Sequence, residues 1–240
     1  MTELRSSEAA LTLKGVSAGY GELMVLRGLD LSVPAGSIVA LLGKNGMGKT
    51  TLLKSAMGFL PKRQGRISMA GVDITTLPAH RIARLEVSYT SQEQALFVDL
   101  SIKDNLRLGL ARDALLNDRL PAIYEIFPFM QGRMAQRAGT LSGGEQKMLL
   151  VARALVARPS LMLVDEITEG LQPSVIDKVG AALRQERDRN GTSMLLVEQN
   201  VGFALAVADR YAVLKRGEIV VEGDTRASGA AEIIRAQLRV

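Results

Sequence analysis

The sequence predicts an α/β protein whose mostly parallel sheet carries helices on both faces. Two observations support this fold class. Short apolar runs typical of buried strands alternate with amphipathic helical stretches, most clearly over residues 159–240. One such run, at 38–42, leads through a glycine-rich turn into a helix. Strands that alternate apolar and polar residues add an antiparallel β layer, and a helical stretch interrupts the strands near the middle of the chain.

The first third of the chain is expected to form the β layer and the start of the parallel sheet. Alternation predicts strands, and the continuous apolar run after the turn Pro34-Ala35-Gly36 predicts a buried one. Pro78 suits the start of a short helix. The expected strands lie at 11–16, 29–33, 38–42, 66–69 and 87–90, and the expected helix at 50–57.

The strand pattern disappears between Ser101 and Arg158, where helical periodicity takes over. We expect one domain over residues 1–240, with a helical subdomain at about 94–158 inserted into a core formed by about 1–93 and 159–240. Pro159 ends the insertion. Helices are expected at 101–110, 114–126, 143–158, 174–189, 201–208 and 230–238, and strands at 161–164, 194–197, 211–214 and 218–221. The last two strands are expected to form a hairpin across Arg216 and Gly217.

Composition limits the class of protein. The 240 residues are 47% hydrophobic, which is enough for a sizeable core. There is no cysteine, so no disulfide or cysteine metal site is possible. Neither a signal peptide nor an apolar run of about 18 residues is found, which favours a cytoplasmic protein. The net charge is +5, but basic and acidic side chains are interleaved, so we expect no nucleic-acid partner and a surface suited to an anionic membrane face.

A phosphate-binding motif follows the strand at 38–42. The order Gly-x-x-x-x-Gly-Lys-Thr lets backbone N–H groups surround a polyphosphate at a helix N-terminus. Lys49 would reach the outer phosphates, and Thr50 would bind Mg²⁺. The alternative is a glycine-rich turn that binds nothing; the strand before it and the helix after it favour a site for ATP and Mg²⁺. The residues concerned are Gly43, Lys44, Asn45, Gly46, Met47, Gly48, Lys49, Thr50 and the adjoining Thr51.

Two carboxylates stand where the strand at 161–164 ends. Ligands of open α/β sheets bind at the carboxyl ends of the strands. Asp165 suits the Mg²⁺ shell, and Glu166 suits activation of the attacking water. The alternative is a pair of acids that face solvent, but the phosphate-binding motif strengthens the catalytic interpretation.

A third motif, Leu-Ser-Gly-Gly-Glu-Gln, opens the helix at 143–158. Ser142 and Glu145 have the spacing of a capping box. Gly143 and Gly144 would also let a phosphate approach bare N–H groups. The two interpretations are compatible.

Residues 141–146 resemble the signature motif of ABC-family ATPases, and the resemblance covers about residues 11–223. It implies that Tyr20 stacks on adenine, although a tyrosine in a turn is the alternative. It implies that Gln92 contacts Mg²⁺ and the water. Ser142, Gly143 and Gly144 would contact the γ-phosphate of ATP held by a second ATPase subunit, while Glu166 and the residue at 199 would act in catalysis.

Three positions depart from the family pattern. Ile167 replaces a proline, and Gln172 replaces the acid of the loop at 169–172 that crosses the dimer interface. Gln199 replaces the switch histidine; it can donate a hydrogen bond to a phosphate but cannot become cationic. His80, the only histidine, is expected on the surface of a helix.

The stretches 44–47 and 196–200 resemble those in the ATPase subunits of importers for branched-chain amino acids, urea and short amides. The stretch 168–173 is more similar to the urea and amide importers than to the amino-acid importers. The resemblance implies an ATP-hydrolysing subunit on the inner face of the cell membrane. Its partners would be a second, different ATPase subunit, two integral membrane permeases and, indirectly, a periplasmic or extracellular solute-binding protein. The apolar segment 94–98 would contact the permease, or else pack internally. The alternatives are a non-transport ABC ATPase that acts on nucleic acid or ribosomes, and a small-metabolite kinase.

Overall fold

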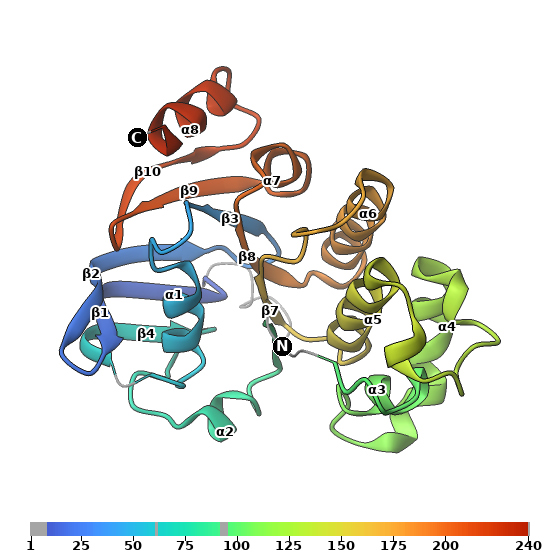
Figure 1. The fold of residues 1–240 in the computed structure, drawn as a ribbon. Helices are drawn as coiled ribbons and strands as arrows, with labels where there is room; N and C mark the ends of the chain where they lie inside the picture. Colours follow the sequence, from blue (N-terminus) through green and yellow to red (C-terminus); the bar gives the residue numbers. More distant parts are fainter. Residues whose placement is uncertain (1–8, 61, 92–95, 240) are drawn as a thin grey trace, which may run out of the picture.

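The computed structural model describes residues 9–60, 62–91 and 96–239. This part of the chain contains two sheets and eight α-helices. The antiparallel sheet lies on one side of α1, and the larger, mostly parallel sheet crosses the centre of the molecule (Figure 1). The predicted α/β architecture with an added antiparallel layer is confirmed.

The larger sheet has the strand order β10-β9-β3-β8-β7-β6. All neighbours run parallel except β9 and β10, which form a hairpin across Arg216 and Gly217, both with positive φ. The sequence predicted this hairpin. The strands are β3 (Ile38–Leu42), β6 (Val87–Thr90), β7 (Leu161–Asp165), β8 (Ser193–Glu198), β9 (Arg210–Lys215) and β10 (Glu218–Asp224).

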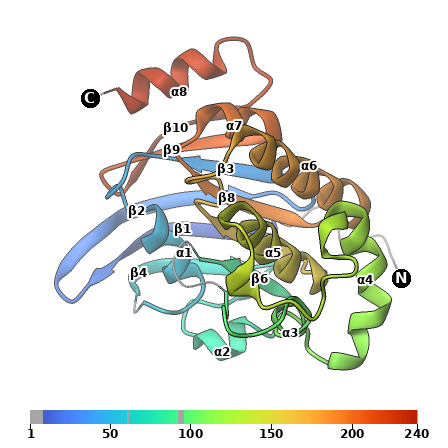
Figure 2. The same ribbon diagram turned by 45° about the vertical axis from the view of Figure 1, so that its right-hand side comes forward.

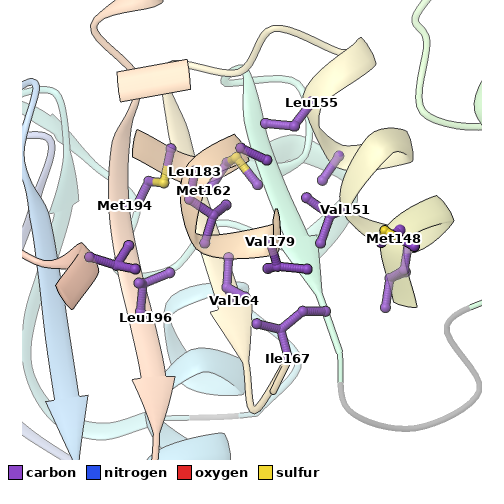
Figure 3. Close-up of a cluster of buried hydrophobic side chains, with 14 of the residues drawn as sticks. Met148, Val151, Leu155, Met162, Val164, Ile167, Val179, Leu183, Met194 and Leu196 are labelled. Atoms are coloured by element: carbon purple, nitrogen blue, oxygen red, sulfur yellow. The ribbon is translucent and has the colours of Figure 1, made fainter. Parts of the chain in front are cut away.

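Every residue of β3, β7 and β8 is buried, because both faces of the sheet are covered. Successive side chains point to opposite faces. One set packs with α1 and the antiparallel sheet, and the other packs with the remaining large helices. Figure 3 shows the second set, in which Met162, Val164 and Leu196 meet side chains of α5 and α6.

The antiparallel sheet has the order β2-β1-β4-β5, and its first two strands are longer than predicted. The pairing of β1 with β2 shifts register three times, and Gly15 and Gly28 have positive φ at these irregularities. Such bulges interrupt the alternation, so the sequence pattern missed the extensions. The strands are β1 (Leu11–Tyr20), β2 (Leu23–Val33), β4 (Lys62–Met69) and β5 (Val72–Asp73).

Figures 1 and 2 show the arrangement of the helices from two directions. Helices α3, α4 and α5 are consecutive in the sequence and lie together, with β7 between them and α1. The first of them ends before the predicted Leu110, because Gly109 meets α5: a Cβ there would lie 2.2 Å from the carbonyl oxygen of Arg153. The helices are α1 (Lys49–Ala56), α2 (Ala79–Ile82), α3 (Ile102–Arg107), α4 (Leu116–Ile126), α5 (Gly143–Val156), α6 (Pro173–Asn190), α7 (Val201–Val207) and α8 (Ala230–Leu238).

Within the described ranges, no helix combines the length and apolar character needed to cross a bilayer. His80 lies exposed on α2, as predicted.

Candidate active site

The register of the parallel strands brings three segments to one edge of the sheet. Leu42 at the end of β3 pairs with Glu198 at the end of β8, and Val197 pairs with Asp165 at the end of β7. The residues that follow these strand ends therefore emerge side by side. They are the glycine loop at 43–50, Glu166 and Gln199.

Packing requires two glycines of the loop in addition to any ligand. A Cβ on Gly43 would lie 2.8 Å from the carbonyl oxygen of Leu214. Gly48 has φ +104°, and a Cβ there would lie 2.9 Å from Cδ2 of Leu26. The loop thus fits against β2 and β9 only without side chains at these positions. Lys44, Asn45 and Gly46 are exposed at its tip.

The hairpin between β9 and β10 also supports the loop. The N–H of Gly217 donates to the carbonyl of Met47 at 3.2 Å, and the N–H of Arg216 donates to the Met47 sulfur at 3.3 Å. Sequence reasoning predicted the turn at Arg216 and Gly217 but not this contact, since residues 170 positions apart carry no local signal of pairing.

Lys49 is only 4% exposed, and its ammonium forms a salt bridge of 2.9 Å with Oε1 of Glu166. It also donates to the carbonyl of Lys44 at 2.9 Å. Glu166 adopts a left-handed backbone with φ +47°, which is strained for a residue with a side chain. A hydrogen bond of 2.9 Å from its N–H to the carbonyl of Val197 helps to hold this conformation.

Gln199 joins the glycine loop to the carboxylate. Its Nε2 donates to Oδ1 of Asn45 at 2.7 Å and to Oε2 of Glu166 at 3.1 Å. Four predicted site residues, Asn45, Lys49, Glu166 and Gln199, are therefore in one connected cluster.

Asp165 is 1% exposed, and no described residue makes a hydrogen bond of normal geometry to either of its carboxylate oxygens. Burial raises its pKa to about 6, while the Thr50 hydroxyl favours the charged form. Oxygen donors of this kind, a carboxylate with unsatisfied lone pairs and a nearby hydroxyl, fit Mg²⁺. The described residues hold no cluster of three or more His, Cys, Asp or Glu, but Mg²⁺ bound with phosphates and water needs none.

A cavity of about 680 Å³ connects the remaining predicted residues of this edge. Thr50, Asp165 and Tyr20 line it, together with Lys54 and Tyr89. Tyr20 ends β1 and is 46% exposed, so its ring is accessible to a ligand. Thr51 is buried on α1, and Gln92 lies outside the described residues.

Ser142 caps α5 by a complete capping box with Glu145, as the sequence predicted. The Oε1 of Glu145 accepts a hydrogen bond of 2.5 Å from Arg133, a contact for which the sequence held no signal. Gly143 has open space where a Cβ would stand. Ser142 and Gly144 line a different cavity of about 690 Å³, and none of its lining residues is shared with the cavity at Asp165. No hydrogen bond or ion pair between the described residues joins Ser142, Gly143 or Gly144 to the glycine loop.

A family model described as "ABC transporter" matches residues 26–169, which include the glycine loop, the motif at 141–146 and the two carboxylates. The chain belongs to the ABC transporter family. The fold of this ABC transporter protein also matches solved structures. A nucleotide-free ATP-binding cassette from an ABC transporter superposes with a TM-score of 0.85 at 22% identity, covering 95% of this chain and 96% of that one. The ADP conformation of the cassette MJ1267 superposes with a TM-score of 0.82 at 23% identity, covering 98% and 97%.

Curated relatives are ATP-binding proteins of several transporters. The high-affinity branched-chain amino acid transport ATP-binding protein BraG of Pseudomonas aeruginosa is 37% identical, covering 95% of this chain and 97% of its own length. The probable branched-chain amino acid transport ATP-binding protein LivF of Archaeoglobus fulgidus is 36% identical, covering 87% and 89%. The lipopolysaccharide export system ATP-binding protein LptB of Escherichia coli K12 is 35% identical, covering 90% of each. The chain is thus an ABC transporter ATPase, which binds ATP and hydrolyses it.

Proposed function

We propose that ATP binds with its phosphates on the loop at 43–50 and its adenine on Tyr20. Lys49, Thr50 and Thr51 contact phosphate, and Thr50 and Asp165, with Gln92, hold Mg²⁺. The ion, when bound, neutralises charge on the β- and γ-phosphates. The support for this assignment is the buried Asp165 carboxylate without a hydrogen-bond partner among the described residues, beside the Thr50 hydroxyl.

Glu166 is the general base that accepts a proton from the attacking water, and Gln199 donates a hydrogen bond to the γ-phosphate. The observation that carries this proposal is the cluster of Lys49, Glu166 and Gln199 at the carboxyl ends of β3, β7 and β8. The arriving γ-phosphate competes with Glu166 for the Lys49 ammonium, which frees the carboxylate to face the water.

The site is completed by a second ATPase subunit. Ser142, Gly143 and Gly144 of one subunit contact the γ-phosphate held by the other, so that two ATP molecules are sandwiched. The open space where a Cβ of Gly143 would stand, at the capped end of α5, supports this arrangement because a phosphate can approach there. The partner is a different ATPase subunit.

The ATPase powers uptake of a branched-chain amino acid, or of urea or a short amide, at the cytoplasmic face of the membrane. BraG and LivF are named for branched-chain amino acid transport, which supports the first solute class. The stretch at 168–173 supports the second. Two integral membrane permeases form the path, and a solute-binding protein delivers the solute.

The permease docks on exposed apolar residues that follow the segment at 92–95. Of the proposed docking segment 94–98, residues 94 and 95 lie outside the described part of the chain. Phe97 is 58% exposed, and Val98 is exposed beside it. A cavity of about 440 Å³ lined by Phe97, Leu108 and Arg153 adjoins them. Phe97→Ala should lower co-purification with the permeases, whereas Leu23→Ala, at an exposed leucine on β2, should not.

Uptake into vesicles that carry the assembled complex tests the proposed function. Labelled leucine and labelled urea are supplied with ATP inside, and Lys49→Ala serves as the inactive control. Uptake of either solute that Lys49→Ala abolishes supports the proposal and selects the solute class. A chain that binds no permease and instead captures RNA or ribosomes would replace it with the non-transport alternative.

A further inference from the structure

One buried carboxylate next to the active site has no part in the chemistry described above. Glu198, the last residue of β8, is 2% exposed. Its Oε1 accepts a hydrogen bond of 3.2 Å from the N–H of Thr168, and its Oε2 accepts one of 2.8 Å from the Thr168 hydroxyl. Its side chain thus joins two segments that are 30 residues apart in the sequence.

The hydrogen bonds that the described residues donate to the Glu198 carboxylate come from uncharged groups alone. These groups belong to Thr168 and to the backbone of Gln199 and Asn200. Burial raises the pKa of Glu198, so ionisation of its carboxylate costs more free energy in the folded state than in water.

The segment that Glu198 holds is the loop of the catalytic carboxylate. Glu166 has the strained φ of +47°, and Gly170 follows with φ +74°. A strained backbone persists only where its surroundings determine it from several directions. Here the N–H of Glu166 bonds to Val197, and Thr168, two residues later, bonds to Glu198. The loop is therefore attached to the end of β8 at two points.

Gln199 follows Glu198 directly and donates to the Glu166 carboxylate at 3.1 Å. Since Glu198 fixes Thr168, it sets the distance between the loop bearing Glu166 and the amide of Gln199. We propose that Glu198 is a positioning residue, which holds Thr168 so that Glu166 and Gln199 converge on one point. This inference rests on the proposed roles of Glu166 and Gln199 in hydrolysis.

The test uses variants that remove or keep the acceptor. Glu198→Met has a similar length, but its thioether is only a weak acceptor in place of two carboxylate oxygens. Its kcat for ATP hydrolysis should fall by about ten- to a hundredfold, with KM within about twofold. Glu198→Gln can still accept from the Thr168 N–H and donate to its hydroxyl, so it should recover most of the rate. Thr168→Val should lower kcat in the same way, and Thr168→Ser should not. The double variant Glu198→Met with Thr168→Val should lose no more than Glu198→Met alone.

The chain offers a matched control in a second buried glutamate. Glu186 on α6 is 5% exposed and accepts from the Thr192 hydroxyl and from Asn190, both at 2.9 Å, without reaching the active-site cluster. Glu186→Met removes a similarly buried hydrogen-bond acceptor and should therefore leave kcat of the folded fraction unchanged. Equal loss of kcat in these two variants, or parental kcat in Glu198→Met, would overturn the inference.

Two further results separate this inference from the proposed function. If Glu166→Gln is inactive while Glu198→Met is parental, only the positioning role fails. If Glu166→Gln itself turns over normally, the assignment of the base fails and the positioning role fails with it. Should Glu198→Met not fold, Thr168→Val against Thr168→Ser decides the matter.

Discussion

The ammonium of Lys49 lies 2.9 Å from Oε1 of Glu166, and both side chains are buried. The pair joins the glycine loop to the end of β7. Removal of one partner from a buried ion pair leaves an uncompensated charge, which is costly. This pair therefore holds the loop against the strand end, and a phosphate that binds Lys49 must substitute for the carboxylate.

Glu166→Gln should abolish hydrolysis and keep nucleotide binding. The amide can still accept a hydrogen bond from Lys49, but it cannot take a proton from water. Phosphate release should fall by at least about a hundredfold. ATP-bound dimers should accumulate, as size-exclusion chromatography with ATP would reveal. Glu232→Gln, at an exposed position of α8, is the control. Normal turnover in Glu166→Gln would remove Glu166 from its role.

Asp165→Asn should change how stability depends on pH. The folded pKa of about 6 exceeds the unfolded value of 3.8, so the folded state binds this proton more tightly. Deprotonation between about pH 4 and pH 6 therefore destabilises the parent, by about 3 kcal/mol in total, and the variant lacks this loss. Urea denaturation without nucleotide or Mg²⁺ measures the difference. Asp118→Asn, exposed on α4, should behave as the parent does. The same Asp165→Asn variant should lose the Mg²⁺ dependence of ATP binding.

Gly143→Ala should stabilise the chain and yet inactivate it. An alanine there has open space and no positive φ to adopt, so helix α5 should gain about 0.5–1 kcal/mol. The added methyl group would obstruct a phosphate that approaches from the second subunit. Gly202→Ala, at a helical glycine of α7 where a Cβ would contact Oδ1 of Asn200 at 3.4 Å, should keep its turnover. Thermal denaturation and phosphate release test both variants, and an active Gly143→Ala would argue against contact in trans.

Gln199→His should introduce a pH dependence that the parent lacks. An amide does not titrate, so parental kcat should show no histidine-type step between pH 6 and 8. A histidine in its place should titrate at about pH 6.5, shifted by its neighbours Asn45 and Glu166. The steady-state rate of phosphate release across this range measures the effect. His80→Gln, exposed on α2, should leave the profile unchanged. A pH profile of kcat in Gln199→His that matches the parental profile would contradict the prediction.

The sequence predicted the order and type of nearly every element, because buried strands and amphipathic helices leave strong periodic patterns. It missed the start of β2 at Leu23, where bulges opposite β1 break the alternation. It also placed the end of α3 too late, since the close approach of Gly109 to Arg153 is a tertiary constraint.

For the candidate site, the motifs predicted roles for Lys49, Asp165, Glu166 and Ser142, because phosphate chemistry demands particular residue types at short spacing. They could not predict that Met47 bonds to Gly217 or that Glu198 bonds to Thr168. These contacts join segments far apart in the chain, and only the register of the sheet brings them together.

The five residues of β7 are buried on both faces and end at two carboxylates with different surroundings. Loss or gain of one residue in this strand would move every later side chain to the opposite face of the sheet. Asp165 would then point to the face on which Val164 packs, and a carboxylate would enter the hydrophobic core between the sheet and the helices. Insertions and deletions among related chains should therefore be confined to surface turns, and the number of residues in β7 should be constant.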